Sequence, residues 1–209
     1  MTEATRELRM ALDACAKAVD DDDGARMPFA LRRAMLRALG PQELDERGFG
    51  TVLVPGKVRR LQLALNVCHR VAPLWFAAFG TTVVSDLLVS AERYMHGEID
   101  LSTVRARTNS LQGQLMNSHQ GHVEAYLAGR AAAACGWVAV GDELLVPDDG
   151  VSQAQLDDPD DDALWDPAFF AAGAEAGGMP WEGTHNTSRY RNFWRWYLEE
   201  AVPTSFSSV

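Results

Sequence analysis

The sequence has few cysteines, and their spacing pairs none of them. Cys15, Cys68 and Cys135 lie far apart, and no CxxC motif is present. An odd, unclustered set of this kind is typical of reduced thiols in a cytoplasmic protein, where cysteine serves as a small core residue. No neighbouring motif would activate a thiolate, so a cysteine nucleophile has little support.

A long, uninterrupted hydrophobic run is also absent. The most apolar stretch, Leu61 to Phe79, is interrupted by Asn66, His69, Arg70 and Pro73, which excludes a membrane-spanning helix there. The chain begins MTEATRELRM, without an apolar run, so a secretory signal is not expected. These absences predict a soluble cytoplasmic protein that does not bind membranes.

Motifs that carry chemistry are missing as well. There is no GxSxG, P-loop, dinucleotide fingerprint or HExxH pattern. His119 and His122 lie three apart with Glu124 nearby, but a metal site needs three or four convergent ligands. The aspartates from Asp157 to Asp162 lack the Gly and Glu that an EF-hand loop requires. We therefore predict a non-enzyme without catalytic residues, metal or cofactor. A metal-dependent hydrolase using His119, His122 and scattered acids stays open as the alternative.

Positive charge is absent from one long segment. From Ala131 to Ser188 there is no Lys or Arg but there are twelve acids, while the rest of the chain has 19 basic and 17 acidic residues and the net charge is −10. Such acidity argues against nucleic-acid binding, which needs a basic surface. Residues from about 141 to 163 show no sustained periodicity, so we expect a long acidic loop there. This loop either is solvated, folds back on the protein's own arginines, or docks a basic partner.

What the sequence does contain is helical periodicity. Apolar residues recur at three-four spacing from Lys57 to Phe79, and only a narrow band of that stretch is polar. A helix that is apolar on most of its circumference belongs at the centre of a bundle. We predict an all-α fold, a single-domain bundle of about seven or eight helices over residues 1–209. The central helix is expected to bend at Pro73 without breaking.

Several residues predict where the other helices begin and end. Ser102 is expected to cap a helix, whose core face would be Val104, Thr108, Leu111 and Leu115. Asp166 is a natural N-cap and Pro167 a natural first helical residue of the helix that follows the acidic loop. Pro203 is expected to end the last helix.

Three ordered stretches are similar to one known family. They are CHRVAPLWFAAF (Cys68 to Phe79) with a next helix that ends AERYMHGEI, DALWDPAFFAAGAEAGG (Asp162 to Gly178), and NFWRWYLEEAVP (Asn192 to Pro203). From about Pro28 onward the chain resembles the all-helical immunity proteins, family five, of bacterial polymorphic toxin systems; the segment up to Ala25 does not. The resemblance implies a small antitoxin that binds and neutralises a toxin domain encoded by a neighbouring gene.

The resemblance also guides the choice of partner-binding residues. The tryptophans that match the family's motifs are interpreted chiefly as core: Trp75, Trp165, Trp194 and Trp196. Many toxin domains act on nucleic acid and are basic, and the acidic segment would mimic the charge of that substrate. The predicted partner-binding residues are Asp148, Asp149, Asp157, Asp158, Asp160, Asp161, Asp162 and Trp181. A helical scaffold or regulatory protein that binds through aromatics around Trp181 is the remaining alternative.

Overall fold

The computed structural model describes residues 3–43, 52–118, 121–141 and 166–207. Within these ranges every regular element is a helix, which confirms the predicted all-α class. No helix in the same ranges is long and apolar enough to cross a membrane. In chain order the elements are α1 (Glu3–Asp21), α2 (Phe29–Ala38), α3 (Pro55–Phe79), α4 (Val83–Met95), α5 (Leu101–Ser118), α6 (Val123–Gly141), α8 (Pro167–Ala176), the 3-10 helix η3 (Pro180–Glu182), α9 (Thr187–Trp196), the π-helix η4 (Tyr197–Ala201) and α10 (Val202–Ser207).

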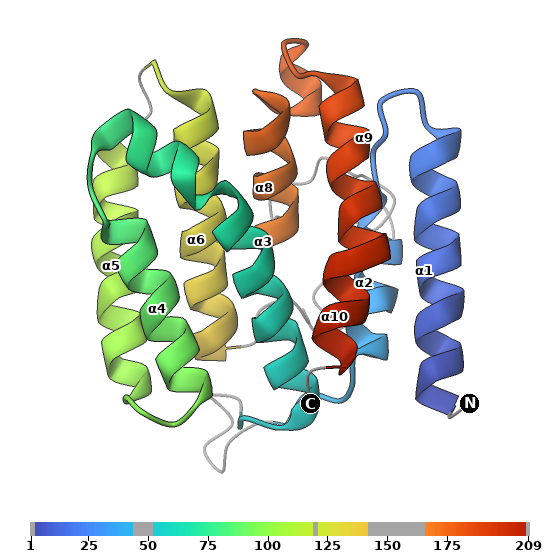
Figure 1. The fold of residues 1–209 in the computed structure, drawn as a ribbon, viewed down its shortest axis with the longest axis horizontal. Coiled ribbons are helices and arrows are strands. Elements are labelled where there is room, and N and C mark those ends of the chain that lie inside the picture. Colours follow the sequence, from blue (N-terminus) through green and yellow to red (C-terminus); the bar gives the residue numbers. More distant parts are fainter. Residues whose placement is uncertain (1–2, 44–51, 119–120, 142–165, 208–209) are drawn as a thin grey trace.

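The helices are arranged around α3 (Figure 1). α4, α5 and α6 lie on one side of it, α8, α9 and α10 lie on the other, and α2 and α1 follow beyond them. α3 packs against α4, α6, α8 and α10, which confirms the prediction of a central apolar helix. α6 is just as central, because it packs against α3, α4, α5 and α8.

The ends of α3 follow from its sequence. Pro55 supplies a first helical residue with a fixed φ, two residues before the predicted start. Gly80 takes a left-handed φ of 65° and its N–H donates to the Phe76 carbonyl, which ends the helix. Pro73 lies within α3 on an exposed position, where water can replace the lost hydrogen bond. Figure 1 shows that α3 changes direction in its C-terminal part, which contains Pro73, without a break.

α5 and α6 approach each other closely because α6 has a glycine at the contact. A Cβ atom at Gly136 would lie 2.1 Å from Oγ1 of Thr108, so no larger residue fits without a shift. Thr108 is completely buried, and its hydroxyl donates to the Val104 carbonyl at 2.9 Å. The predicted core face of α5 is confirmed, since all four of its residues are buried: Val104, Thr108, Leu111 and Leu115.

Two predicted helix ends are wrong. α5 begins at Leu101, so Ser102 lies in its first turn rather than at the cap. Pro203 does not end the last helix, because α9 runs through η4 into α10. In η4 the Val202 N–H donates to the Tyr197 carbonyl, five residues back. This wider turn lies directly before Pro203 and accommodates a residue that has no N–H to donate.

Candidate partner-binding surface

The seven aspartates of the predicted binding segment lie in residues 142–165, outside the described residues. The residues on either side of that segment are described. Gly141 ends α6, and its carbonyl accepts a hydrogen bond from Nε2 of Gln42 at 3.5 Å. Asp166 precedes α8, which packs along α6. The acidic segment therefore connects the end of α6 to the start of α8, and these two helices pack against each other.

The charge of the chain is divided sharply between this segment and the helices. The described residues contain 18 Lys and Arg and 18 Asp and Glu, so they are neutral as a whole. Residues 142–165 contain nine acids and no basic residue, and residues 44–51 contain two acids and one Arg. The net charge of −10 therefore lies entirely outside the described helices.

Three of the twelve acids between Ala131 and Ser188 are described, and each has a partner within the fold. Asp166 accepts a hydrogen bond from the Phe169 N–H at 2.8 Å, which confirms its predicted role as an N-cap. Glu175 receives two hydrogen bonds from Arg70, at 2.6 and 2.7 Å. Glu182 accepts one from the Met179 N–H at 2.9 Å. These three support the local structure, which leaves nine acids in residues 142–162 as candidates for binding a partner.

Asp166 also forms a buried ion pair with Arg32 of α2. Nη1 of Arg32 lies 3.3 Å from Oδ2 of Asp166, and the side chains are 1% and 7% exposed. The guanidinium lies over aromatic rings, with centroids at 4.8 Å for Phe169 and 5.9 Å for Trp194. Two charges can be buried here because each offsets the other and the rings attract the cation. The pair fixes the point at which the acidic segment rejoins the helices.

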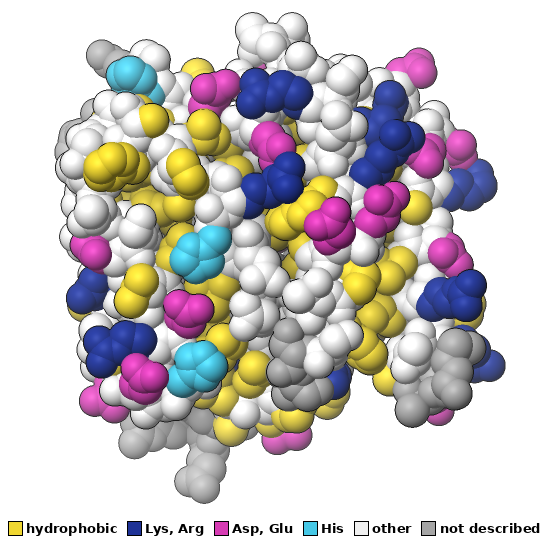
Figure 2. Space-filling model, in the orientation of Figure 1, with side chains coloured by type: hydrophobic (Ala, Val, Ile, Leu, Met, Phe, Trp, Pro, Cys, Tyr) yellow, Lys and Arg dark blue, Asp and Glu magenta, His cyan; other side chains and the backbone are white. Residues whose placement is uncertain are grey.

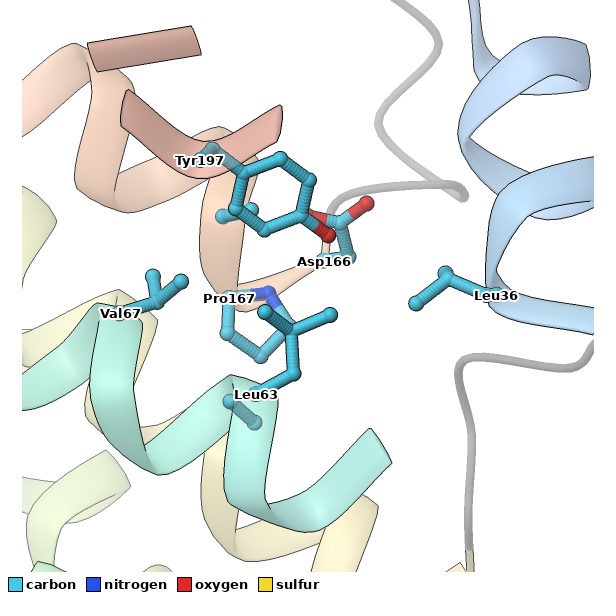
Figure 3. A pocket seen from close by; sticks show the side chains of 8 residues that line it. Leu36, Leu63, Val67, Asp166, Pro167 and Tyr197 are labelled. Atoms are coloured by element: carbon cyan, nitrogen blue, oxygen red, sulfur yellow. The ribbon is translucent and has the colours of Figure 1, made fainter. Parts of the chain in front are cut away.

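A small cavity lies beside this ion pair (Figure 3). Its volume is about 10 Å³, room for about one water molecule. The Tyr197 hydroxyl and the Asp166 carboxylate lie close together at its edge, among apolar side chains such as Leu63. Burial raises the pKa of Tyr197 well above its usual value; the charge of Asp166 adds to this and that of Arg32 opposes it. Among the described residues, Oδ2 of Asp166 and the guanidinium of Arg32 have no hydrogen-bond partner of good geometry.

Trp181, the one predicted binding residue that the structure describes, lies in η3. It is 44% exposed, and its ring stacks on that of Phe169 with centroids 5.9 Å apart and an angle of 26° between the planes. The stack ties Trp181 to the aromatic surroundings of Arg32 while leaving part of the indole accessible. The structure does not bring Trp181 into a deep pocket.

Those candidate catalytic residues that the structure describes do not assemble into a site. Within the described ranges, no three His, Cys, Asp or Glu side chains lie close enough together to hold a metal ion. His122 packs edge-on against Phe79 with ring centroids 5.4 Å apart, and His119 lies outside the described residues. All three cysteines are buried, as expected. Burial raises the pKa of Cys15 to about 12, although the charge of Arg32 opposes the shift, so this thiol stays protonated at neutral pH.

The structure also reveals a surface that the sequence reasoning missed. Residues 71–85 and 108–123 contain no Lys, Arg, Asp or Glu, and their described parts lie at one end of the bundle, in the upper left of Figure 1. We call this surface the neutral end. It exposes the apolar side chains of Phe76 (55%), Met116 (86%) and Val123 (42%). Figure 2 shows hydrophobic side chains and a histidine in this area, and no Lys or Arg. The absence of charge from both stretches was readable in the sequence.

Across the described ranges, these observations define an all-helical protein with a buried ion pair at the start of α8 and an uncharged apolar surface at one end of the bundle. The family of Immunity protein Imm5 matches residues 12–204, and the chain belongs to this family. The resemblance noted in the sequence is thereby confirmed, and the match begins earlier than expected, within α1. No curated protein matches the chain.

Three of the four tryptophans that match the family's motifs lie in described residues. Trp75 and Trp194 are buried, which confirms that they belong to the core. Trp196 is only partly buried, and the guanidinium of Arg70 lies 4.2 Å from its ring centroid. Trp165 lies outside the described residues. Trp196 packs against the core from its edge, with its ring centroid 5.6 Å from that of Phe193, so the three described tryptophans all contribute to packing.

Proposed function

We propose that this protein is an antitoxin that binds and neutralises a cognate toxin domain encoded by a neighbouring gene. It acts in the cytoplasm, without catalysis, and its acidic residues from 142 to 162 dock on a basic face of the toxin. Membership of the immunity family supports the role as a toxin inhibitor. The observation that carries the docking mode is the division of charge, with a neutral set of helices and nine acids in one segment.

This division of charge favours recognition by a basic partner. Concentrated charge of one sign attracts an oppositely charged protein from a distance and accelerates encounter, and it also rejects acidic partners. The helices add no competing net charge, so the field of the molecule is dominated by residues 142–162. The ion pair of Asp166 with Arg32 fixes the point where this segment rejoins the fold.

Two alternatives receive less support. A metal-dependent hydrolase would need converging ligands, and the described residues supply no group of three. A scaffold that binds through Trp181 would use an aromatic side chain that already stacks on Phe169. Stoichiometric zinc, iron or manganese in the purified protein would favour the first alternative. A stable complex with a protein other than a toxin would favour the second.

The test is the association rate with the toxin domain taken from the adjacent gene. We expect replacement of Asp157, Asp158, Asp160, Asp161 and Asp162 by Asn to slow association about tenfold or more at low salt. The slope of the rate against ionic strength, from about 50 to about 300 mM salt, should flatten, because fewer charges contribute to attraction. Stopped-flow fluorescence or surface plasmon resonance measures both quantities.

The matched control removes the same number of negative charges from the helices. Five exposed acids there are suitable for replacement by Gln or Asn: Glu3, Glu7, Asp13, Glu199 and Glu200. We expect this variant to lose much less of the association rate. Equal losses in the two variants would show that only total charge matters, and unchanged binding in both would overturn the proposed docking mode.

A further inference from the structure

The small cavity beside the ion pair of Arg32 with Asp166 has polar side chains at one edge and is otherwise lined by apolar residues. We propose that this cavity is a binding site for one water molecule, which donates a hydrogen bond to Oδ2 of Asp166 and accepts one from the hydroxyl of Tyr197. The water is part of the fold, because it joins the residue that caps α8 to the first residue of η4. The site is independent of the proposed antitoxin role.

The two oxygens of the Asp166 carboxylate differ in their hydrogen bonds. Oδ1 accepts the Phe169 N–H at 2.8 Å. Oδ2 lies 3.3 Å from Nη1 of Arg32, but among the described residues no donor reaches it with hydrogen-bond geometry. Pro167, the next residue along the chain, has no N–H to offer. Because a buried acceptor without a hydrogen bond is costly and rare, Oδ2 calls for a donor that is not a protein side chain.

The hydroxyl of Tyr197 lies next to this carboxylate at the edge of the cavity (Figure 3). Tyr197 is buried, and its ring contacts two other aromatic rings, with centroids at 6.3 Å for Phe193 and 5.4 Å for Trp194. These contacts fix the position of the ring, so the hydroxyl cannot turn towards bulk solvent. A buried tyrosine hydroxyl usually has a hydrogen-bond partner, and it can both donate and accept. The hydroxyl therefore supplies the second polar group that a bound water needs.

The size and the charge of the cavity favour water over other occupants. The volume of about 10 Å³ holds one water molecule and nothing larger. The carboxylate of Asp166 would repel an anion such as chloride, and the guanidinium of Arg32 would repel a cation. The occupant is therefore a neutral molecule that donates and accepts hydrogen bonds. Since the rest of the lining is apolar, the water has two side-chain partners, at the lower limit for buried waters.

The direct test is a high-resolution crystal structure of the full chain. We expect one ordered water in the cavity, at about 2.5 to 3.0 Å from both Oδ2 of Asp166 and the hydroxyl oxygen of Tyr197. A dry cavity overturns the proposal. A hydrogen bond made directly between Tyr197 and Asp166, with no water between them, also overturns it.

Oxygen-17 magnetic relaxation dispersion tests the same site in solution by counting long-lived buried waters. We expect Tyr197→Phe to lower this count by one, because the replacement removes one of the two partners of the water. The control is Tyr190→Phe, which removes the hydroxyl of another buried tyrosine, one that does not line the cavity. The control should leave the count unchanged. Equal counts in the wild-type protein and in Tyr197→Phe would contradict the proposal.

A second variant keeps the test decisive if Tyr197→Phe does not fold. Val67→Ile adds a methylene to a side chain that lines the cavity, so it should expel the water. We expect the count of long-lived waters to fall by one and the midpoint of urea unfolding to decrease, because Oδ2 of Asp166 then loses its donor. A higher midpoint with an unchanged count would show that the cavity is dry and that the methylene fills it, which overturns the proposal. None of these measurements involves a toxin, so they leave the antitoxin role untouched.

Discussion

Arg32 illustrates how a single side chain holds distant parts of this fold together. It comes from α2, pairs with Asp166 before α8, and packs on Trp194 of α9. Burying its charge has a desolvation cost of several kcal/mol, which the ion pair and the rings offset. Loss of one partner leaves the charge of the other buried without compensation. Replacing one residue of the pair should therefore destabilise the fold more than replacing both.

We expect Arg32→Met to lower the free energy of unfolding by about 3 to 5 kcal/mol, because Asp166 then keeps a buried, uncompensated charge. In the double variant Arg32→Met with Asp166→Asn, the loss should be clearly smaller than the sum of the two single losses. Asn at 166 can still cap α8, so the double variant keeps that hydrogen bond. Urea unfolding followed by circular dichroism measures these differences.

The exposed pair of Arg195 with Asp20, at 2.8 Å, serves as the control. Both of its side chains are about half exposed, so Arg195→Met should cost far less stability than Arg32→Met. Additive losses at Arg32 and Asp166 would show that the two residues do not act as a pair.

For single residues, the sequence predicted some roles and not others. The dipeptide Asp166-Pro167 is a local signal, and the cap it predicts is present. The pairing of Asp166 with Arg32 has no local signal, because the two residues meet only when α2 and α8 are packed together. The predicted acids at 148–162 are outside the described residues, so their role stays a prediction.

At the scale of the helices, the close contact of α5 with α6 depends on a glycine, which has no side chain. We expect Gly136→Ala to destabilise the protein by about 1 to 3 kcal/mol, because the new Cβ would overlap with Thr108 and force the helices apart. Gly113→Ala on α5 is the matched control, since a Cβ there meets no atom within 4 Å. That change should stabilise the helix by up to about 1 kcal/mol. Thermal or urea unfolding of both variants distinguishes a packing effect from a change in helix propensity; destabilisation by both would contradict the role of the close contact.

Helix positions were predicted well because apolar periodicity reports burial directly. The face of α5 and the central place of α3 both followed from three-four spacing. The ends were less predictable where several signals compete. Ser102 is a good cap in isolation, but the Thr103 N–H donates to the Asp100 carbonyl, and the helix starts at Leu101, two residues before the start that a cap at Ser102 would give. A proline usually ends a helix, but the wider π-helical turn of η4 accommodates Pro203. No sequence pattern predicts that turn.

Across the whole molecule, several titratable groups are buried in different helices, and burial makes each of them harder to ionise. Burial raises the pKa of Cys15 in α1 to about 12, and it raises that of Cys68 in α3 and Tyr197 in η4 well above their usual values. In the unfolded chain these groups ionise at lower pH than in the folded protein. Their contribution to stability is therefore complete below about pH 9 and is lost as the pH rises towards 12.

We expect the free energy of unfolding to fall steadily above about pH 9, measured by urea unfolding at a series of pH values. Cys15→Ala should reduce this dependence, because one of the ionising groups is gone. The native protein should also fail to react with a thiol reagent until it is unfolded, since all three cysteines are buried. Stability that stays constant up to about pH 11 would contradict this account.

The length of α6 separates the neutral end from the residue after which the acidic segment begins. Its 19 residues, from Val123 to Gly141, span about 28 Å. A partner that contacts the fold at one of these two points therefore reaches the other only if it also extends along α6.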